Sequence, residues 1–312
     1  MLIKQLIEIS DLLDDPYVDG KKITDYLHVI CANANISIHT IRGEKGKTDE
    51  VKIVIPGING RFNGGQSPTL GIIGRLGGIG ARPNVTGFVS DGDGALVTLT
   101  IAAKLLCMHE RGENLQGDII ISTHICSSSP IQPHYPVPFM GSVADMETMN
   151  HFEVDPAMDA ILVFDTTKGN NILNYSGYAI TNTVKAGWIL RVSDDLLQIM
   201  ARTSGCLPVV LPVSMQDITP YGNGIFHINS ILQPCTVTDA PVVGVAITTE
   251  TCVPGCAANA SHFDDLEATA NFGLETAVQY TANNIAFYDN EEYERILQKY
   301  GNMKILQTLG KL

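Results

Sequence analysis

Side chains that can hold a metal ion or carry a proton stand where predicted strands end. The apolar run IIIST is followed by His124 and Cys126, and the run ILVF by Asp165. Asp91 and His262 each come shortly before a predicted helix. In a parallel sheet the carboxyl ends of the strands share one edge, where α/β proteins bind ligands. Because two carboxylates and an imidazole suit Zn²⁺ or a similar divalent ion, the sequence predicts a metal site of Asp91, Asp165 and His262.

The glycine-rich segment before Asp91, LGIIGRLGGIGARP, lacks the features of a nucleotide site. A P-loop needs a lysine and a hydroxyl residue after its last glycine, and neither is present. The dinucleotide fingerprint fails because ARP follows Gly80. An EF-hand counted from Asp91 would have alanine at its fifth and twelfth positions. We therefore expect no nucleotide cofactor, and the plain interpretation of Asp93 is an N-cap for the next helix.

The elements that must position these residues alternate between helix and strand. Apolar residues at a 3.6-residue period predict helices, and short β-branched runs bounded by Gly and Pro predict strands. The predicted helices cover 2–13, 19–32, 94–113, 194–203 and most of 261–300. The predicted strands cover 36–43, 51–57, 69–76, 117–123, 159–165, 187–193, 207–213 and 240–250. Apolar strands interleaved with helices indicate a three-layer α/β fold, a mostly parallel mixed sheet with helices on both faces.

Few features of the sequence suggest a boundary between domains. It has no internal repeat and no low-complexity linker, so we expect one domain over residues 1–312. The stretch 127–141, SSSPIQPHYPVPFMG, is too rich in proline for a helix or an inner strand. It predicts a long ordered loop, which is a common place for function.

Composition restricts the partners of the chain. The formal net charge is −13 and Lys and Arg form no cluster, which argues against nucleic acid. No apolar stretch reaches the roughly 18 residues of a membrane span, and the opening MLIKQLIEISDLLDD carries acids where a signal peptide is apolar. Seven scattered cysteines fit reduced thiols. We expect a soluble cytoplasmic protein without membrane or nucleic-acid partners.

The order of the segments resembles the co-catalytic zinc exopeptidases, a superfamily of aminopeptidases and carboxypeptidases with a phosphorylase/hydrolase-like core. The similar segments cover most of the chain: KIVIPG and TLGIIGRLGG, SDGDGALVTLTIAAKLL, QGDIIISTHIC, MDAILVFDTT, and APVVGVAITTE with ASHFDDLEATANF. The resemblance implies that Asp91 is the bridging ligand, Asp165 a terminal ligand and His262 the last ligand. Two positions depart from the superfamily. Arg75 and Gly77 replace its first histidine and acid, and THICSS replaces its paired glutamates.

Arginine stays charged and repels a metal ion, so a standard two-zinc site is not expected. The leading hypothesis is a hydrolase that keeps one divalent ion, zinc being the expected one, and cleaves a small amide or peptide-like molecule. The metal would lower the pKa of bound water and polarise the carbonyl, while Arg75 holds a substrate carboxylate. His124 would replace the missing glutamate base. The whole chain also resembles an uncharacterised bacterial family of about this length, named only as a domain of unknown function.

Two alternatives need no metal. In the first, the same cleft binds a small anionic ligand through Arg75, Arg82, Lys168 and the backbone amides of LGGIG and TTKGN. In the second, Cys126 acts as a nucleophile with His124 or His134, because a neighbouring imidazolium stabilises a thiolate.

The segment QDITPYGNGIFHINS is assigned to substrate binding, because the corresponding region shapes the substrate pocket of the zinc exopeptidases. Its candidate side chains are Tyr221, Asn223 and His227, and a turn built from its proline and glycines is the alternative. The superfamily often inserts a dimerisation domain between its first two ligand positions, where this chain has only a short segment. By analogy we expect a homo-oligomer that uses the core itself.

Overall fold

The computed structural model describes residues 1–43, 46–135, 137–213 and 228–308. At its centre is a mixed sheet with the strand order β1 (Asn35–Gly43), β2 (Gly46–Ile55), β4 (Ile119–Ile125), β3 (Leu70–Gly74), β7 (Ala160–Thr166), β12 (Val242–Thr248), β8 (Gly177–Thr181) and β11 (Val210–Leu211). Strands β4, β3, β7 and β12 run parallel to one another. β1 and β2 extend the sheet on one side by antiparallel pairing, and β8 runs antiparallel to β12 on the other. The predicted α/β fold with a mostly parallel mixed sheet is confirmed.

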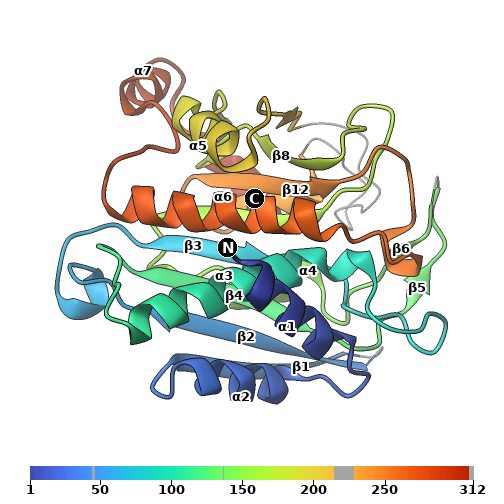
Figure 1. Ribbon diagram of the computed structural model, residues 1–312. Helices are drawn as coiled ribbons and strands as arrows, with labels where there is room; N and C mark the ends of the chain where they lie inside the picture. Colours follow the sequence, from blue (N-terminus) through green and yellow to red (C-terminus); the bar gives the residue numbers. More distant parts are fainter. Residues whose placement is uncertain (44–45, 136, 214–227, 309–312) are drawn as a thin grey trace.

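Helices cover both faces of this sheet (Figure 1). One face carries α1 (Ile3–Asp14), α2 (Gly20–Ile30), α3 (Asp93–Glu110), α5 (Asp194–Ser204) and α6 (Phe263–Thr281). The helices α3 and α6 lie side by side over the central strands. The other face carries α4 (Met146–Glu153) and the 3-10 helix Ser230–Thr236, while α7 (Asn290–Tyr300) lies near α5.

Alternation along the strands divides the core between the two faces. Ile119 and Ile121 of β4 pack with α1, α3 and α6, whereas Ile120 packs with the 3-10 helix on the opposite face. This is the period of two that a strand imposes on its side chains. Helix α3 is buried on nearly all sides because the sheet, α1, α2 and α6 surround it. That position explains a helix that is apolar around its whole circumference.

Some predicted elements differ from the structure. The strand expected over 207–213 is reduced to β11, because Pro208 and Pro212 lack the N–H groups that a longer ladder needs. The strand expected over 187–193 is reduced to β10 (Trp188–Ile189), which pairs with β9 (Val184–Lys185). The loop expected over 127–141 contains a small hairpin, β5 (Ile131–Gln132) and β6 (Phe139–Met140). No strand was expected over 177–181, where the structure has β8.

Candidate functional site

The carboxyl ends of β3 and β7 meet the first turn of α3. Gly94 makes this approach feasible, because a Cβ atom there would lie 2.6 Å from the carbonyl oxygens of Arg75 and Phe164. Asp91 and Asp93, which come shortly before Gly94, are therefore placed at the edge of the sheet. This is the edge that the sequence identified as the candidate site.

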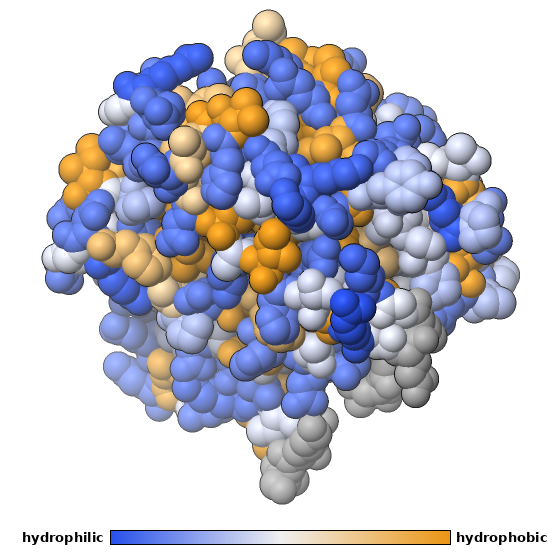
Figure 2. Space-filling view, turned by 90° about the horizontal axis from the view of Figure 1, so that it is seen from below, coloured by the Kyte–Doolittle hydropathy of each residue, from blue (hydrophilic) through white to orange (hydrophobic). Residues whose placement is uncertain are grey.

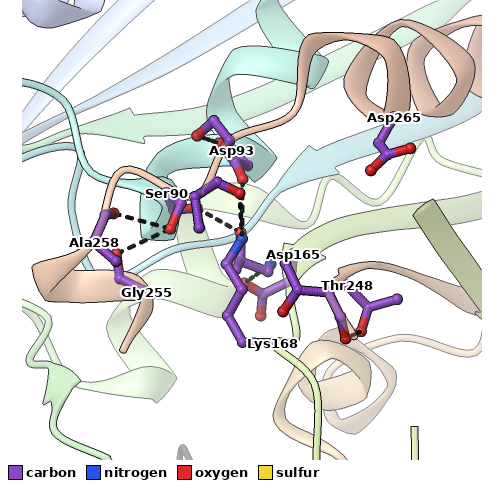
Figure 3. Close-up of polar contacts among 12 residues, drawn as sticks. Ser90, Asp93, Asp165, Lys168, Thr248, Gly255, Ala258 and Asp265 are labelled. Carbon is purple, nitrogen blue, oxygen red and sulfur yellow. Dashed lines mark hydrogen bonds and ion pairs between the residues drawn. The ribbon is translucent and has the colours of Figure 1, made fainter. Parts of the chain in front are cut away.

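A buried ion pair lies at this edge (Figure 3). The Lys168 ammonium is 3.5 Å from Oδ2 of Asp93, and both side chains are at most 2% exposed. The ammonium also donates to the carbonyl of Ala260 at 3.3 Å, and the Ser261 hydroxyl donates to Asp93. Burial raises the pKa of Asp93 to about 6, although Lys168 and Ser261 oppose the rise. Helix α3 has Gly92 as its N-cap and begins at Asp93 itself, so the N-cap interpretation of Asp93 is wrong.

Asp91 lies beside this pair and is partly exposed. Its carboxylate accepts a hydrogen bond from the amide of Gly77 at 3.1 Å. Burial raises the pKa of Asp91 to about 6, against the lowering effect of the Gly77 and Gly78 amides. The loop that carries Gly255 and Cys256 packs against Asp91, and burial together with the Asp91 charge raises the pKa of the Cys256 thiol to about 11. This thiol therefore stays protonated at neutral pH.

Backbone contacts hold this loop and the start of α3 together. Both the amide and the hydroxyl of Ser90 donate to the carbonyl of Ala258, at 3.0 and 3.1 Å. The Thr166 hydroxyl, at the end of β7, donates to the carbonyl of Ser90 at 2.8 Å. Segments from three parts of the chain are thus joined around Asp91.

Asp165 is the penultimate residue of β7 and accepts a hydrogen bond from the amide of Thr166 at 2.7 Å. His262 precedes α6 with an exposed side chain, and its charge opposes the rise that burial causes in the pKa values of Asp93 and Asp265. Within the described ranges, no three His, Cys, Asp or Glu side chains gather closely enough to hold a metal ion. The Lys168 ammonium also stands beside Asp93, where it would repel a metal ion.

His124 and Cys126 support the loop that follows β3. The buried ring of His124 has Nε2 2.8 Å from the carbonyl of Leu76 and Nδ1 2.8 Å from the Thr48 hydroxyl. Because a carbonyl can only accept, Nε2 carries the proton and Nδ1 accepts from Thr48. Burial lowers the pKa of His124 to about 4. The Cys126 sulfur is buried and accepts from the Ser129 hydroxyl at 3.0 Å. Both candidate catalytic residues are thus hydrogen-bonded within the protein and help to hold this loop in place.

The arginines that were expected to bind substrate also have partners within the protein. Arg75 extends to the opposite face of the sheet, where Nη1 lies 2.7 Å from Oε2 of Glu153. Arg82 donates to the carbonyls of Ser127, at 3.1 Å, and Asp14, at 2.6 Å. The other candidates for substrate binding, Tyr221, Asn223 and His227, lie outside the described residues.

Two residues that pair with the candidate side chains were not expected from the sequence, Ser261 and Glu153. Ser261 was passed over beside His262, and Glu153 was not singled out although it meets Arg75. The motif DGDG did mark the position of Asp93, but no local pattern could show that its partner is Lys168. The two residues are 75 positions apart.

A hollow of about 740 Å³ lies away from this edge, between α4 and residues 237–240. Its lining includes Asn150, Lys185 and Asp239, and it contains none of the predicted metal ligands or candidate catalytic residues. The charged groups at the sheet edge and this hollow are therefore separate features of the molecule.

The fold and the edge together define an α/β protein with a charged site at the carboxyl ends of its parallel strands. The chain belongs to the family described as Protein of unknown function (DUF1177), whose sequence profile matches residues 39–310. Among solved structures it is similar to the crystal structure of LapA from Legionella pneumophila, at 12% identity and a TM-score of 0.50 over 89% of this chain and 71% of that one. That likeness concerns the fold alone. A search of curated proteins gave no significant match. Among the described helices, none has both the length and the apolar character needed to cross a bilayer.

Proposed function

We propose that this chain binds a small molecule with a protonated amine at the carboxyl edge of its sheet, and that it needs no metal ion to do so. The observation that supports this is the charge balance of the edge. Burial raises the pKa values of Asp91, Asp93 and Asp265, and the charge of Lys168 opposes the rise in each, so the three acids lie within reach of its field. Asp165 is close by at the end of β7 (Figure 3). After Lys168 pairs with Asp93, the remaining carboxylates leave the edge negative.

This balance disfavours the anionic ligand that the sequence suggested as an alternative. Arg75 and Arg82 are engaged elsewhere, and the amide of Gly77 already binds the carboxylate of Asp91. An organic cation is better suited, because one or two carboxylates are enough to bind an ammonium group through charge-assisted hydrogen bonds. Zinc, in contrast, needs three or four ligands in one tetrahedron.

The finer architecture that we propose is the zinc-exopeptidase-like core, in which the Lys168 ammonium supplies part of the positive charge that a metal would bring. Support comes from the parallel strands β4, β3, β7 and β12 and from two acids at positions that the resemblance implies, Asp91 before α3 and Asp165 in β7. On this analogy the amine belongs to an amino-acid-like or peptide-like molecule.

Calorimetric titration at pH 7.5 tests the proposal with leucinamide and N-acetylleucinamide as probes. Leucinamide should bind and the acetylated compound should not, because acetylation removes the charge. Asp91→Asn should weaken binding by about tenfold or more, the value of one hydrogen bond to a charged group. Asp264→Asn, an exposed acid of the same region, is the matched control.

Two results would contradict the proposal. One is equal binding of both probes. The other is tight, stoichiometric binding of Zn²⁺ that His262→Ala abolishes, which would restore the one-metal hydrolase as the better hypothesis.

A further inference from the structure

A second group of buried charges lies on the opposite face of the sheet, under α4. Arg75 donates from Nη1 to Oε2 of Glu153 at 2.7 Å and to Oδ1 of Asn150 at 2.8 Å. Glu50 of β2 belongs to the same group, because the charges of Glu153 and Arg75 both act on it. The residues Glu50, Arg75 and Glu153 are 3%, 6% and 0% exposed. We call these three residues the Glu50 cluster.

The acids of this cluster have too few hydrogen-bond donors. Both carboxylate oxygens of Glu50 and Oε1 of Glu153 are buried with no hydrogen-bond partner among the described residues. Buried carboxylates without donors are costly, because nothing replaces the water they lose. A proton on one carboxyl group removes a charge and supplies a donor at once.

The groups that face Glu50 come from every element packed around it. They are His39 of β1, Lys52 of β2, Arg75 after β3, His124 of β4 and Glu153 of α4. Two of them are occupied elsewhere, because Lys52 pairs with Asp155 at 3.1 Å and His39 stacks on Phe152 with ring centroids 4.3 Å apart.

The remaining charges do not balance without a proton. His124 is neutral, because both of its ring nitrogens are hydrogen-bonded and burial lowers its pKa to about 4. Two carboxyl groups then share one guanidinium in a place without water contact. Neutrality requires one proton on the carboxyl pair.

We propose that Glu50 and Glu153 form a buried proton-binding site that holds one proton at neutral pH and fastens α4 to the sheet through Arg75. The proton resides mainly on Glu50, because Arg75 is in direct contact with Glu153. Burial and the neighbouring acid raise the pKa of Glu50 well above its usual range, and burial raises that of Glu153 to about 7.

The site makes the attachment of α4 sensitive to pH in a definite direction. A carboxyl group whose pKa is higher in the folded chain than in the unfolded chain stabilises the fold at low pH. Its contribution is lost as the pH rises above the unfolded value, near 4.5, toward the folded value. Alkaline conditions should therefore loosen α4 together with Arg75, which lies two residues before the Gly77 amide that binds Asp91.

Infrared difference spectroscopy at pH 8 tests the proposal on the intact chain. Asp91 and Asp93, with pKa values of about 6, are ionised at this pH. The unmodified protein should still show the carbonyl stretch of a protonated carboxylic acid. Glu50→Gln should remove the band, and the control Glu147→Gln, an exposed acid of α4, should leave it unchanged.

Thermal unfolding between pH 5 and pH 9 gives an independent readout. Glu50→Gln mimics the protonated acid, so its midpoint should fall less with rising pH and should equal or exceed that of the unmodified chain at pH 9. Glu153→Gln leaves Arg75 unpaired and should lower the midpoint over most of the range. Absence of the carboxylic acid band at pH 8, or an equal loss of stability in Glu50→Gln at every pH, would overturn the proposal. The first of these outcomes requires no variant to fold.

Discussion

At the scale of single residues, two separate ion pairs are buried in the part of the chain that the structure describes. Lys168 with Asp93 lies at the carboxyl edge, and Arg75 with Glu153 lies under α4. Buried pairs contribute little net stability, because the loss of hydration offsets the attraction. What they do impose is a requirement that both partners be present. The loss of either partner leaves a buried charge alone.

Lys168→Met should therefore destabilise the fold by about 3–5 kcal/mol at pH 8, the usual cost of removing one partner of a buried pair. The cost should be smaller at pH 5, because the pKa of Asp93 is already about 6 and rises further once Lys168 is gone. Asp93 is then neutral at the lower pH. Urea unfolding at both pH values measures the difference.

The double variant Lys168→Met with Asp93→Asn serves as the control for this prediction. It should recover much of the loss at pH 8, because no buried charge is left unpaired. A loss of the same size at both pH values would show that Lys168 acts through packing and not through its charge.

Some residues of this edge could be singled out from the sequence, and their partners could not. Asp91 was singled out because an acid between a strand and a helix has few structural explanations. Arg75 was recognised as incompatible with a metal, but its partner Glu153 lies 78 positions away on a helix that no motif marks. Which distant side chains meet is decided by tertiary packing, and a single sequence carries no local signal for it.

At the scale of elements, periodicity was a good guide where segments are long and apolar. The helix expected over 94–113 is α3, which begins one residue earlier, at Asp93, and ends at Glu110. The strand expected over 117–123 is β4, shifted by two residues. The short strands beyond β12 in the sheet, β8 and the edge strand β11, were missed or overextended, because their pairing depends on neighbours and their own patterns are weak.

The contact between α3 and the strand ends leads to a prediction for Gly94. Gly94→Ala should destabilise the fold by roughly 1–3 kcal/mol, the range for overpacking, even though alanine is the better helix former. The added carbon would lie 2.6 Å from two backbone carbonyl oxygens, and backbone at the end of a central sheet cannot move aside easily. Urea unfolding of the variant measures the loss.

Gly273→Ala in α6 is the comparison for Gly94→Ala. The new carbon there would meet the ends of the Ile101 and Phe164 side chains, at 2.6 and 2.8 Å. Side chains can shift more easily than backbone, so this variant should cost less. Equal costs would mean that the backbone contact at Gly94 is not the reason for the glycine.

At the scale of the whole molecule, the surface and the core give different information. The side that bears α2 and β1, seen in Figure 2, shows hydrophilic residues around small separate apolar groups. With a net charge of −13, this chain is expected to repel polyanions. On one face of the sheet the core is continuous: α1 and α2, which precede the start of the family profile at residue 39, share one apolar cluster with α3 and α6.

The N-terminal helices should therefore unfold together with the sheet and not as a separate unit. The amides of Leu2 and Ile3 donate to Oε1 of Glu267 in α6, at 2.8 and 2.9 Å, which ties the first turn of α1 to a helix more than 260 residues later in the sequence.

Leu6 is fully buried in the common core, whereas the next residue, Ile7, is 47% exposed. Leu6→Ala should lower the free energy of unfolding by about 2–5 kcal/mol, and Ile7→Ala should change it by no more than roughly 0.5 kcal/mol. In urea, circular dichroism and Trp188 fluorescence should report one shared transition for both variants, because a single cooperative core allows only one. If Leu6→Ala instead melts α1 in an early step and leaves the main transition in place, the first helices form a separate unit.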